Sequence, residues 1–151
     1  MTSKEIKKEL DEMLKPIKSF CKRWDVNFEY GTDTLGINYI IDKVDELINL
    51  LNNQDNEQLK LRIYNFVKLK QDLDLLATSM NHLSALEATL VYQVLLIDKS
   101  QIELAGDKVF WTRFNIEYIS APKINVLFRD ACFNLLEMIK YNQIKNLSYT
   151  V

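Results

Sequence analysis

Glycine, proline, cysteine and histidine are all scarce in this sequence. Its 151 residues include 3 Gly, 2 Pro, 2 Cys and 1 His. All-β domains and glycine-rich phosphate-binding loops need more turn-forming residues than this, so the composition predicts long helices joined by few loops. The two cysteines, Cys21 and Cys132, lie far apart and fit no metal-binding spacing. We therefore expect both thiols to be free and buried.

Long apolar runs are also missing. No stretch reaches 18 apolar residues, and the first five residues, Met-Thr-Ser-Lys-Glu, do not lead into an apolar segment. These absences predict a cytoplasmic protein without membrane contact. Apolar residues nevertheless make up 48% of the chain, enough for a packed core at this length. We expect a single helical domain over residues 1–151.

Charge is distributed unevenly along the chain. Residues 1–51 carry 8 Lys/Arg and 10 Asp/Glu, residues 52–105 carry 5 and 7, and residues 106–151 carry 6 and 4. Only the C-terminal third is net positive. A surface that binds nucleic acid is therefore expected there, although a difference of this size also arises by chance.

Apolar residues recur three and four positions apart along most of the chain, a pattern that predicts an all-α helical bundle of about five to seven helices. The expected helices cover residues 3–14, 40–51, 57–80, 83–97 and 110–118, followed by a long helix capped by Ser120. Lys15-Pro16 is expected to end the first helix, and Gly31-Thr32-Asp33 to form a turn. Residues 17–36 and 98–110 show the least regular pattern.

The expected helix 57–80 carries an apolar stripe of Leu59, Ile63, Phe66, Leu73 and Ala77, interrupted by Lys70. Such a stripe faces either the core of its own domain or a second helix in a coiled coil. Fewer than four heptads are present, which favours the core face. A homodimer formed through this helix is the alternative hypothesis.

No group of residues indicates catalysis. The sole histidine, His82, lies at an expected break between helices with no nucleophile motif beside it. Phosphate-loop, dinucleotide and zinc-protease motifs are absent, and the carboxylates lie beside lysines on helical faces. We therefore expect no enzymatic activity, metal site or cofactor. Two aromatic groups, Trp24-Phe28-Tyr30 and Phe110-Trp111-Phe114, are either core anchors or binding surfaces, and core anchors are the favoured interpretation.

The C-terminal third contains the most informative local pattern. A short helix is expected to lead through a tight turn at Ile119-Ser120 into a second helix, the layout of a helix-turn-helix. Ile124, Leu127, Phe128 and Ala131 would be buried on the second helix. The side chains expected to face DNA are Lys123, Asn125 and Arg129, with Ser120 at the start of the helix. An ordinary pair of antiparallel helices has the same periodicity and stays open as the alternative.

Residues 83–140 resemble the helix-turn-helix of sigma-factor region 4, and more narrowly the phage late transcription regulators of the ArpU, RinA and LtrC type. The matching residues are Tyr92, Trp111, Ile119-Ser120, Lys123-Ile124 and Ala131. The resemblance implies an all-α fold and binding to double-stranded DNA, with Lys123 among the residues that match the family pattern.

The sequence therefore predicts a DNA-binding transcription regulator from a phage or mobile genetic element. Its N-terminal helices would serve homodimerisation or contact with RNA polymerase. The alternative function is a protein-interaction module that modulates a phage or host regulator without binding DNA. The acidic N-terminal two-thirds of the chain would suit a basic partner.

Overall fold

The structure is a computed structural model that describes residues 1–27, 34–54 and 57–149. Within those ranges it is built from helices alone and contains no strand, which confirms the predicted all-α class. The helices are α1 (Ser3–Arg23), α2 (Thr34–Asn52), α3 (Glu57–Met80), α4 (Ala85–Val91), the π-helical turn η1 (Tyr92–Leu96), α5 (Gln101–Ala105), α6 (Lys108–Thr112) and α7 (Ala121–Tyr149). The predicted turn at 31–33 and the aromatics Phe28 and Tyr30 lie outside the described residues.

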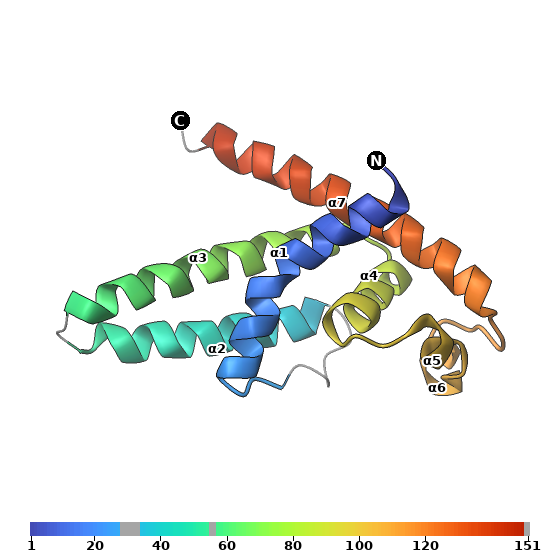
Figure 1. Ribbon diagram of the computed structural model, residues 1–151, viewed down its shortest axis with the longest axis horizontal. Helices are drawn as coiled ribbons and strands as arrows, with labels where there is room; N and C mark the ends of the chain where they lie inside the picture. The colour runs from blue at the N-terminus through green and yellow to red at the C-terminus, as the bar shows by residue number, and fades with distance from the viewer. Residues whose placement is uncertain (28–33, 55–56, 150–151) are drawn as a thin grey trace.

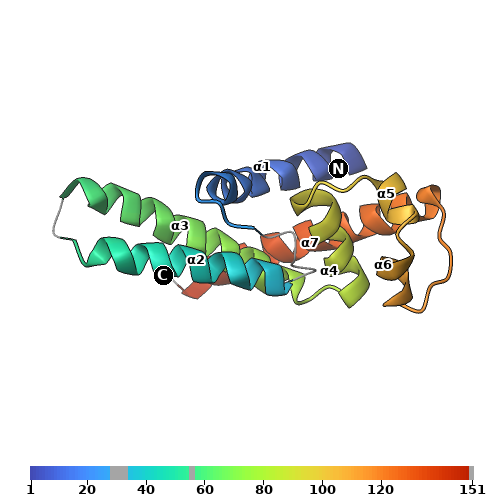
Figure 2. The same cartoon turned by 90° about the horizontal axis from the view of Figure 1, so that it is seen from below.

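Helix α1 continues through Pro16, so the predicted end of the first helix at Lys15-Pro16 is wrong. The helix bends near its middle, as both views in Figures 1 and 2 show, and proline is a common cause of such a bend. Beyond Pro16, the side chains of Ile17, Phe20 and Cys21 are all buried. Their burial offsets the backbone hydrogen bond that proline removes. The helix is capped by Thr2, whose hydroxyl accepts from the Glu5 amide at 3.2 Å.

Helices α2 and α3 form an antiparallel hairpin at one end of the elongated molecule (Figure 1). The bounds of α3 match the predicted helix 57–80, and the polar break before it separates the two helices. On the apolar stripe of α3, Leu73 and Ala77 are buried, and the Phe66 ring packs edge-on against Phe20 of α1 at 5.8 Å. The stripe therefore faces the core of its own chain. Lys70, its polar interruption, forms an ion pair with Asp45 of α2 at 2.8 Å.

Helix α7 connects the two ends of the molecule. Its 29 residues, about 43 Å long at the usual rise per residue, pack against α1, α3, α4 and α5, and Figures 1 and 2 show it crossing the molecule. Two side-chain hydrogen bonds fix these crossings. Asn142 donates to the Ser79 hydroxyl of α3 at 3.0 Å in a buried contact, and Asn134 donates to the Glu87 carboxylate of α4 at 2.7 Å.

Helix α4 begins with a capping box in which Ser84 and Glu87 each bond the other's backbone amide. Burial acts to raise the pKa of the Glu87 carboxyl, but hydrogen bonds from Asn134 and Ser84 outweigh it, so the pKa lies below its usual value. The helix then widens into the π-helical turn η1. There the Tyr92 hydroxyl lies so close to Gly36 of α2 that a β-carbon at residue 36 would overlap it.

The buried side chains form two separate clusters. The main core joins α1, α2, α3, η1 and α7, and includes both cysteines as free, buried thiols, as predicted. Burial raises the pKa of Cys21 to about 11 and that of Cys132 to about 12. A second, smaller cluster lies beside the first half of α7 and consists of Leu90, Leu104, Phe110, Trp111, Ile119 and Ile124.

None of the described helices combines the length and apolar character that crossing a membrane requires.

Candidate nucleic-acid interface

The start of α7 has the cap that the sequence predicted. The Ser120 hydroxyl accepts a hydrogen bond from the Lys123 amide at 3.3 Å, and the Ser120 carbonyl accepts from the Ile124 amide at 3.1 Å. Pro122 lies in the first turn, where its missing N–H leaves no helical bond unmade. The helix therefore begins at a fixed residue, and the side chains of its first turns have defined directions.

The two faces of this helix end divide as predicted. Ile124 and Phe128 are buried, and Leu127 is half-buried against the second cluster. Lys123, Asn125 and Arg129 are all exposed. Asn125 and Arg129 are four residues apart and lie on the same side of the helix, whereas Lys123 points to another side. Neither Lys123 nor Arg129 forms an ion pair with any residue that the structure describes. Both cations are therefore available to a ligand.

Asn125 has a partner that the sequence did not indicate. Its side-chain oxygen accepts a hydrogen bond from the Gln101 amide of α5 at 3.3 Å. This bond orients the Asn125 side chain and leaves its amide N–H groups as donors. Asp130, one residue beyond Arg129, is also exposed and places a negative charge on the same helix end.

The predicted tight turn before this helix is wrong. Helix α6 ends at Thr112 instead of extending over residues 110–118, and residues 113–120 form a longer connection to α7. The backbone amides of Phe114 and Ile116 both bond to the Trp111 carbonyl, and Asn115 adopts a positive φ of 58°. The chain thus turns sharply around Trp111. Because these bonds are made by the backbone, the periodicity of apolar side chains could not predict them.

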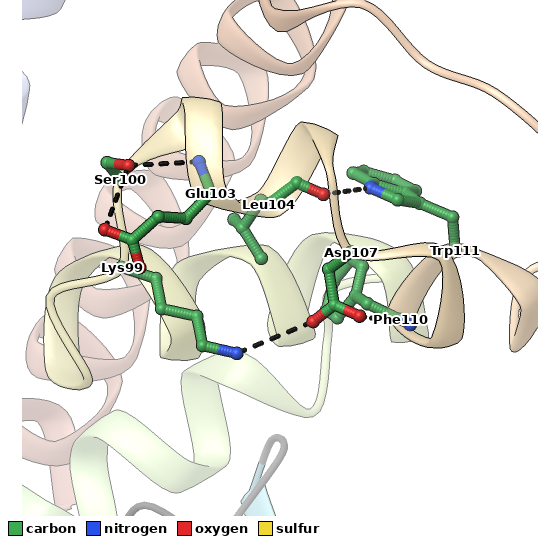
Figure 3. A network of polar contacts seen from close by, with 7 residues as sticks. All are labelled: Lys99, Ser100, Glu103, Leu104, Asp107, Phe110 and Trp111. Carbon is green, nitrogen blue, oxygen red and sulfur yellow. Dashed lines mark hydrogen bonds and ion pairs between the residues drawn. The ribbon is translucent and has the colours of Figure 1, made fainter.

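The short helices behind the α7 end are held by a polar network that Figure 3 shows. Ser100 caps α5 by accepting from the Glu103 amide at 3.1 Å, and Asp107 caps α6 by accepting from the Phe110 amide at 3.1 Å. Asp107 also forms an ion pair with Lys99 at 3.6 Å. The Trp111 indole N–H donates to the Leu104 carbonyl at 2.6 Å. The pattern Ser-x-x-Glu at residue 100 is the sequence signal that could have located α5.

The other residues that the sequence singled out lie either in the core or at the surface. Phe110 and Trp111 are buried and Phe114 is half-buried, so this aromatic group anchors the core, as favoured. Trp24 is 39% exposed and packs edge-on against Phe66 at 5.9 Å. His82 is exposed in the turn that follows α3. Within the described ranges, no three His, Cys, Asp or Glu side chains come together as a metal site would require.

Comparison of the chain with protein-family models, with curated proteins and with solved structures finds no match in any of the three.

Proposed function

We propose that this protein is a DNA-binding transcription regulator, of the kind that phages and mobile genetic elements encode, and that it contacts double-stranded DNA with the first turns of α7. The supporting observation is that Lys123, Asn125 and Arg129 are all exposed on a helix end whose apolar face packs into the second cluster, the one that contains Trp111 (the Trp111 cluster). Side chains on a rigid helix end can enter the major groove. The connection before α7 is longer than in a helix-turn-helix, so only α7 is assigned to the groove.

The three side chains have different expected roles. Arg129 can pair with both acceptors on the edge of guanine, and the free amide of Asn125 can donate to a base. Lys123 is a point charge near the helix start and suits a phosphate. Replacing Arg129 should therefore cost about 1–3 kcal/mol of binding free energy at the preferred site and relax preference at one base pair. Replacing Lys123 should weaken binding to all sequences alike.

The test begins by selecting a preferred duplex from a random-sequence pool. Binding of that duplex and of mixed-sequence DNA is then measured by fluorescence anisotropy over a range of salt concentrations. Arg129→Gln is compared with Arg62→Gln, which removes the same charge from an exposed site on α3 at the other end of the molecule. We expect only Arg129→Gln to lose sequence preference. Absence of duplex binding at low salt, or equal losses in the two variants, would refute the proposal.

A second candidate is the protein-interaction module, and one observation favours it. In the outer half of the α2–α3 hairpin, between Val44 and Leu69, no described side chain is buried. Leu50, Leu61 and Tyr64 are each more than half exposed there. Exposed apolar groups on a projecting hairpin suit contact with another protein chain. The partner that the sequence suggested for such a module is a phage or host regulator, whereas a second copy of this chain would fit either candidate function.

Sedimentation at high micromolar concentration tests whether a second copy of the chain binds this exposed apolar surface. A dimer that the double variant Leu61→Glu/Tyr64→Glu converts to a monomer would support it. A wild-type protein that stays monomeric over the whole concentration range would exclude a homodimer.

A further inference from the structure

Helix α1 is the most basic element of the molecule, although the N-terminal third of the sequence is net acidic. Residues 3–23 carry seven Lys/Arg and four Asp/Glu, whereas residues 24–51 carry one and six. Residues 121–149, which form α7, carry four and two. Helices α1 and α7 pack against each other, so the positive charge of the chain is concentrated on two helices that cross (Figure 1).

The lysines of α1 lie mainly on one face. Lys4, Lys8, Lys15 and Lys22 are four and seven residues apart, spacings that return to the same side of a helix. All four are exposed. The opposite face carries the buried side chains Ile6, Leu10, Leu14 and Ile17. At the usual helical rise, the line of lysines is about 27 Å long.

A groove of about 580 Å³ lies between this lysine face and the end of η1. Five lysines of α1 line one side, and Val94, Leu95 and Asp98 line the other. Two of the lysines have acidic partners. Lys18 pairs with Asp98 at 2.7 Å, and Lys7 pairs with Asp11 at 3.6 Å.

The other three lysines of the groove, Lys4, Lys8 and Lys15, form no ion pair in the described part of the chain. Asp11 and Glu12 also line the groove, so the lysines outnumber the carboxylates there by five to three. The groove therefore has a net positive wall with ammonium groups that a ligand can neutralise.

We propose that the α1 groove binds the sugar–phosphate backbone of double-stranded DNA. Lys4 and Lys15 are eleven residues apart, about 16 Å along the helix, so no single phosphate can reach both. One DNA strand presents a negative charge about every 3.4 Å along its axis, and about five charges would lie along that distance. The ligand is thus an extended polyanion. The groove uses lysine throughout, which suits contacts that read charge and not sequence.

A membrane surface, which is also polyanionic, fits the groove less well than DNA. A helix that lies in a membrane surface needs an exposed apolar face beside its lysines, whereas the apolar face of α1 is buried in the core. An acidic protein segment is the remaining alternative, and it is made an outcome of the test. The inference shares its ligand with the proposed function, but it concerns a different surface, so each can fail alone.

The test compares two triple variants that remove the same charge. Lys4→Gln/Lys8→Gln/Lys15→Gln changes the groove, and Lys60→Gln/Arg62→Gln/Lys68→Gln changes exposed positions on α3. Binding to a mixed-sequence duplex is measured over a range of salt concentrations, and the thermal midpoint of each variant confirms that it is folded. The groove variant should lose up to about 2.7 units of the slope of log K against log salt, about 0.9 for each phosphate contact. The α3 variant should keep the wild-type slope.

The outcomes separate the two surfaces. A groove variant that loses slope while Arg129→Gln has no effect would support the groove and refute the α7 contact. A groove variant with the wild-type slope, or an α3 variant with an equal loss, would overturn the groove. If the wild-type protein binds poly-glutamate but not duplex DNA at low salt, both DNA contacts are refuted, and the groove is a site for acidic protein segments.

Discussion

The two ends of the molecule are stabilised in different ways. At the hairpin end, α2 and α3 are long and regular. In their outer part, between Val44 and Leu69, none of the side chains that the structure describes is buried. At the other end, α5 and α6 have only five residues each, yet they surround Trp111, which is 1% exposed. The length of a helix therefore does not indicate how densely the region around it is packed.

This difference indicates which interactions stabilise each end. Isolated helices of five residues are unstable in water because nucleation is unfavourable. Helices α5 and α6 thus depend on their caps and on the Trp111 cluster. The outer hairpin depends more on its own backbone hydrogen bonds and on half-buried contacts such as Phe66 against Trp24. A change at one end should consequently affect stability far more than a similar change at the other.

The largest effect is expected from Trp111→Ala. Loss of this buried ring should lower the free energy of unfolding by about 3–5 kcal/mol, measured by urea denaturation. Trp111→Phe is the matched control. It keeps an aromatic ring but removes the bond to the Leu104 carbonyl, and it should cost about 1–3 kcal/mol. A loss below about 1 kcal/mol for the alanine variant would mean that the second cluster does not hold this end together.

Gly36→Ala tests the base of the hairpin, where α2 meets η1. The added methyl group would overlap the Tyr92 hydroxyl, so we expect a loss of about 1–3 kcal/mol in unfolding free energy. Combining it with Tyr92→Leu removes the hydroxyl and also the ring carbons that the methyl group would overlap. The double variant should then be destabilised by less than the sum of the two single variants. Strict additivity would show that the close approach is not the cause.

The buried thiol of Cys132 should make the unfolding free energy of the main core depend on pH. The pKa of Cys132 is raised from 9.0 to about 12 by burial, so above pH 9 the thiol ionises in the unfolded chain first. Stability from this group is complete below pH 9 and is lost as the pH rises toward 12. Between pH 8 and pH 10 the wild-type protein should lose about 1 kcal/mol more than Cys132→Ala. Equal losses would show that the folded thiol is accessible to water.

The smallest effect is expected at the outer hairpin. Leu61→Ala should change the unfolding free energy by less than about 0.5 kcal/mol, because the side chain is 68% exposed. Phe66→Ala on the same helix is the contrast. Its ring packs against Phe20 and Trp24, and its loss should cost about 2 kcal/mol. If Leu61→Ala destabilises as much as Phe66→Ala, the outer face of the hairpin is covered in solution.

The predictable parts of the fold were those set by local pattern. The polar break before Glu57 and the regular stripe after it located α3, and periodicity divided the start of α7 into a face with Ile124 and a face with Arg129. The course of the chain at Pro16 and around Trp111 was not predictable. In both places contacts from distant segments outweigh the local preference, because burial of Phe20 or Trp111 contributes more than one helical hydrogen bond.

The candidate site was likewise predictable only where local spacing determines it. Spacing identified which side chains of α7 are exposed, but the Gln101–Asn125 bond joins residues 24 positions apart and has no local signal. The lysine face of α1 was missed for a different reason. A charge count over a third of the chain hides it, because the acidic residues that follow α1 cancel the positive charge of the helix. Counting charge by helix face would have found it.

The π-helical turn η1 changes the direction in which the chain leaves helix α4. The Ile97 amide bonds to the Tyr92 carbonyl five residues back, one more than in an α-helix. That additional residue turns the following chain by about 100° relative to an uninterrupted α-helix. A relative with one residue fewer here would continue as a plain α-helix, and its later segments would leave α4 in another direction. The direction in which the chain leaves η1 toward α5 thus depends on the length of one turn, which an insertion or deletion can change in a single step.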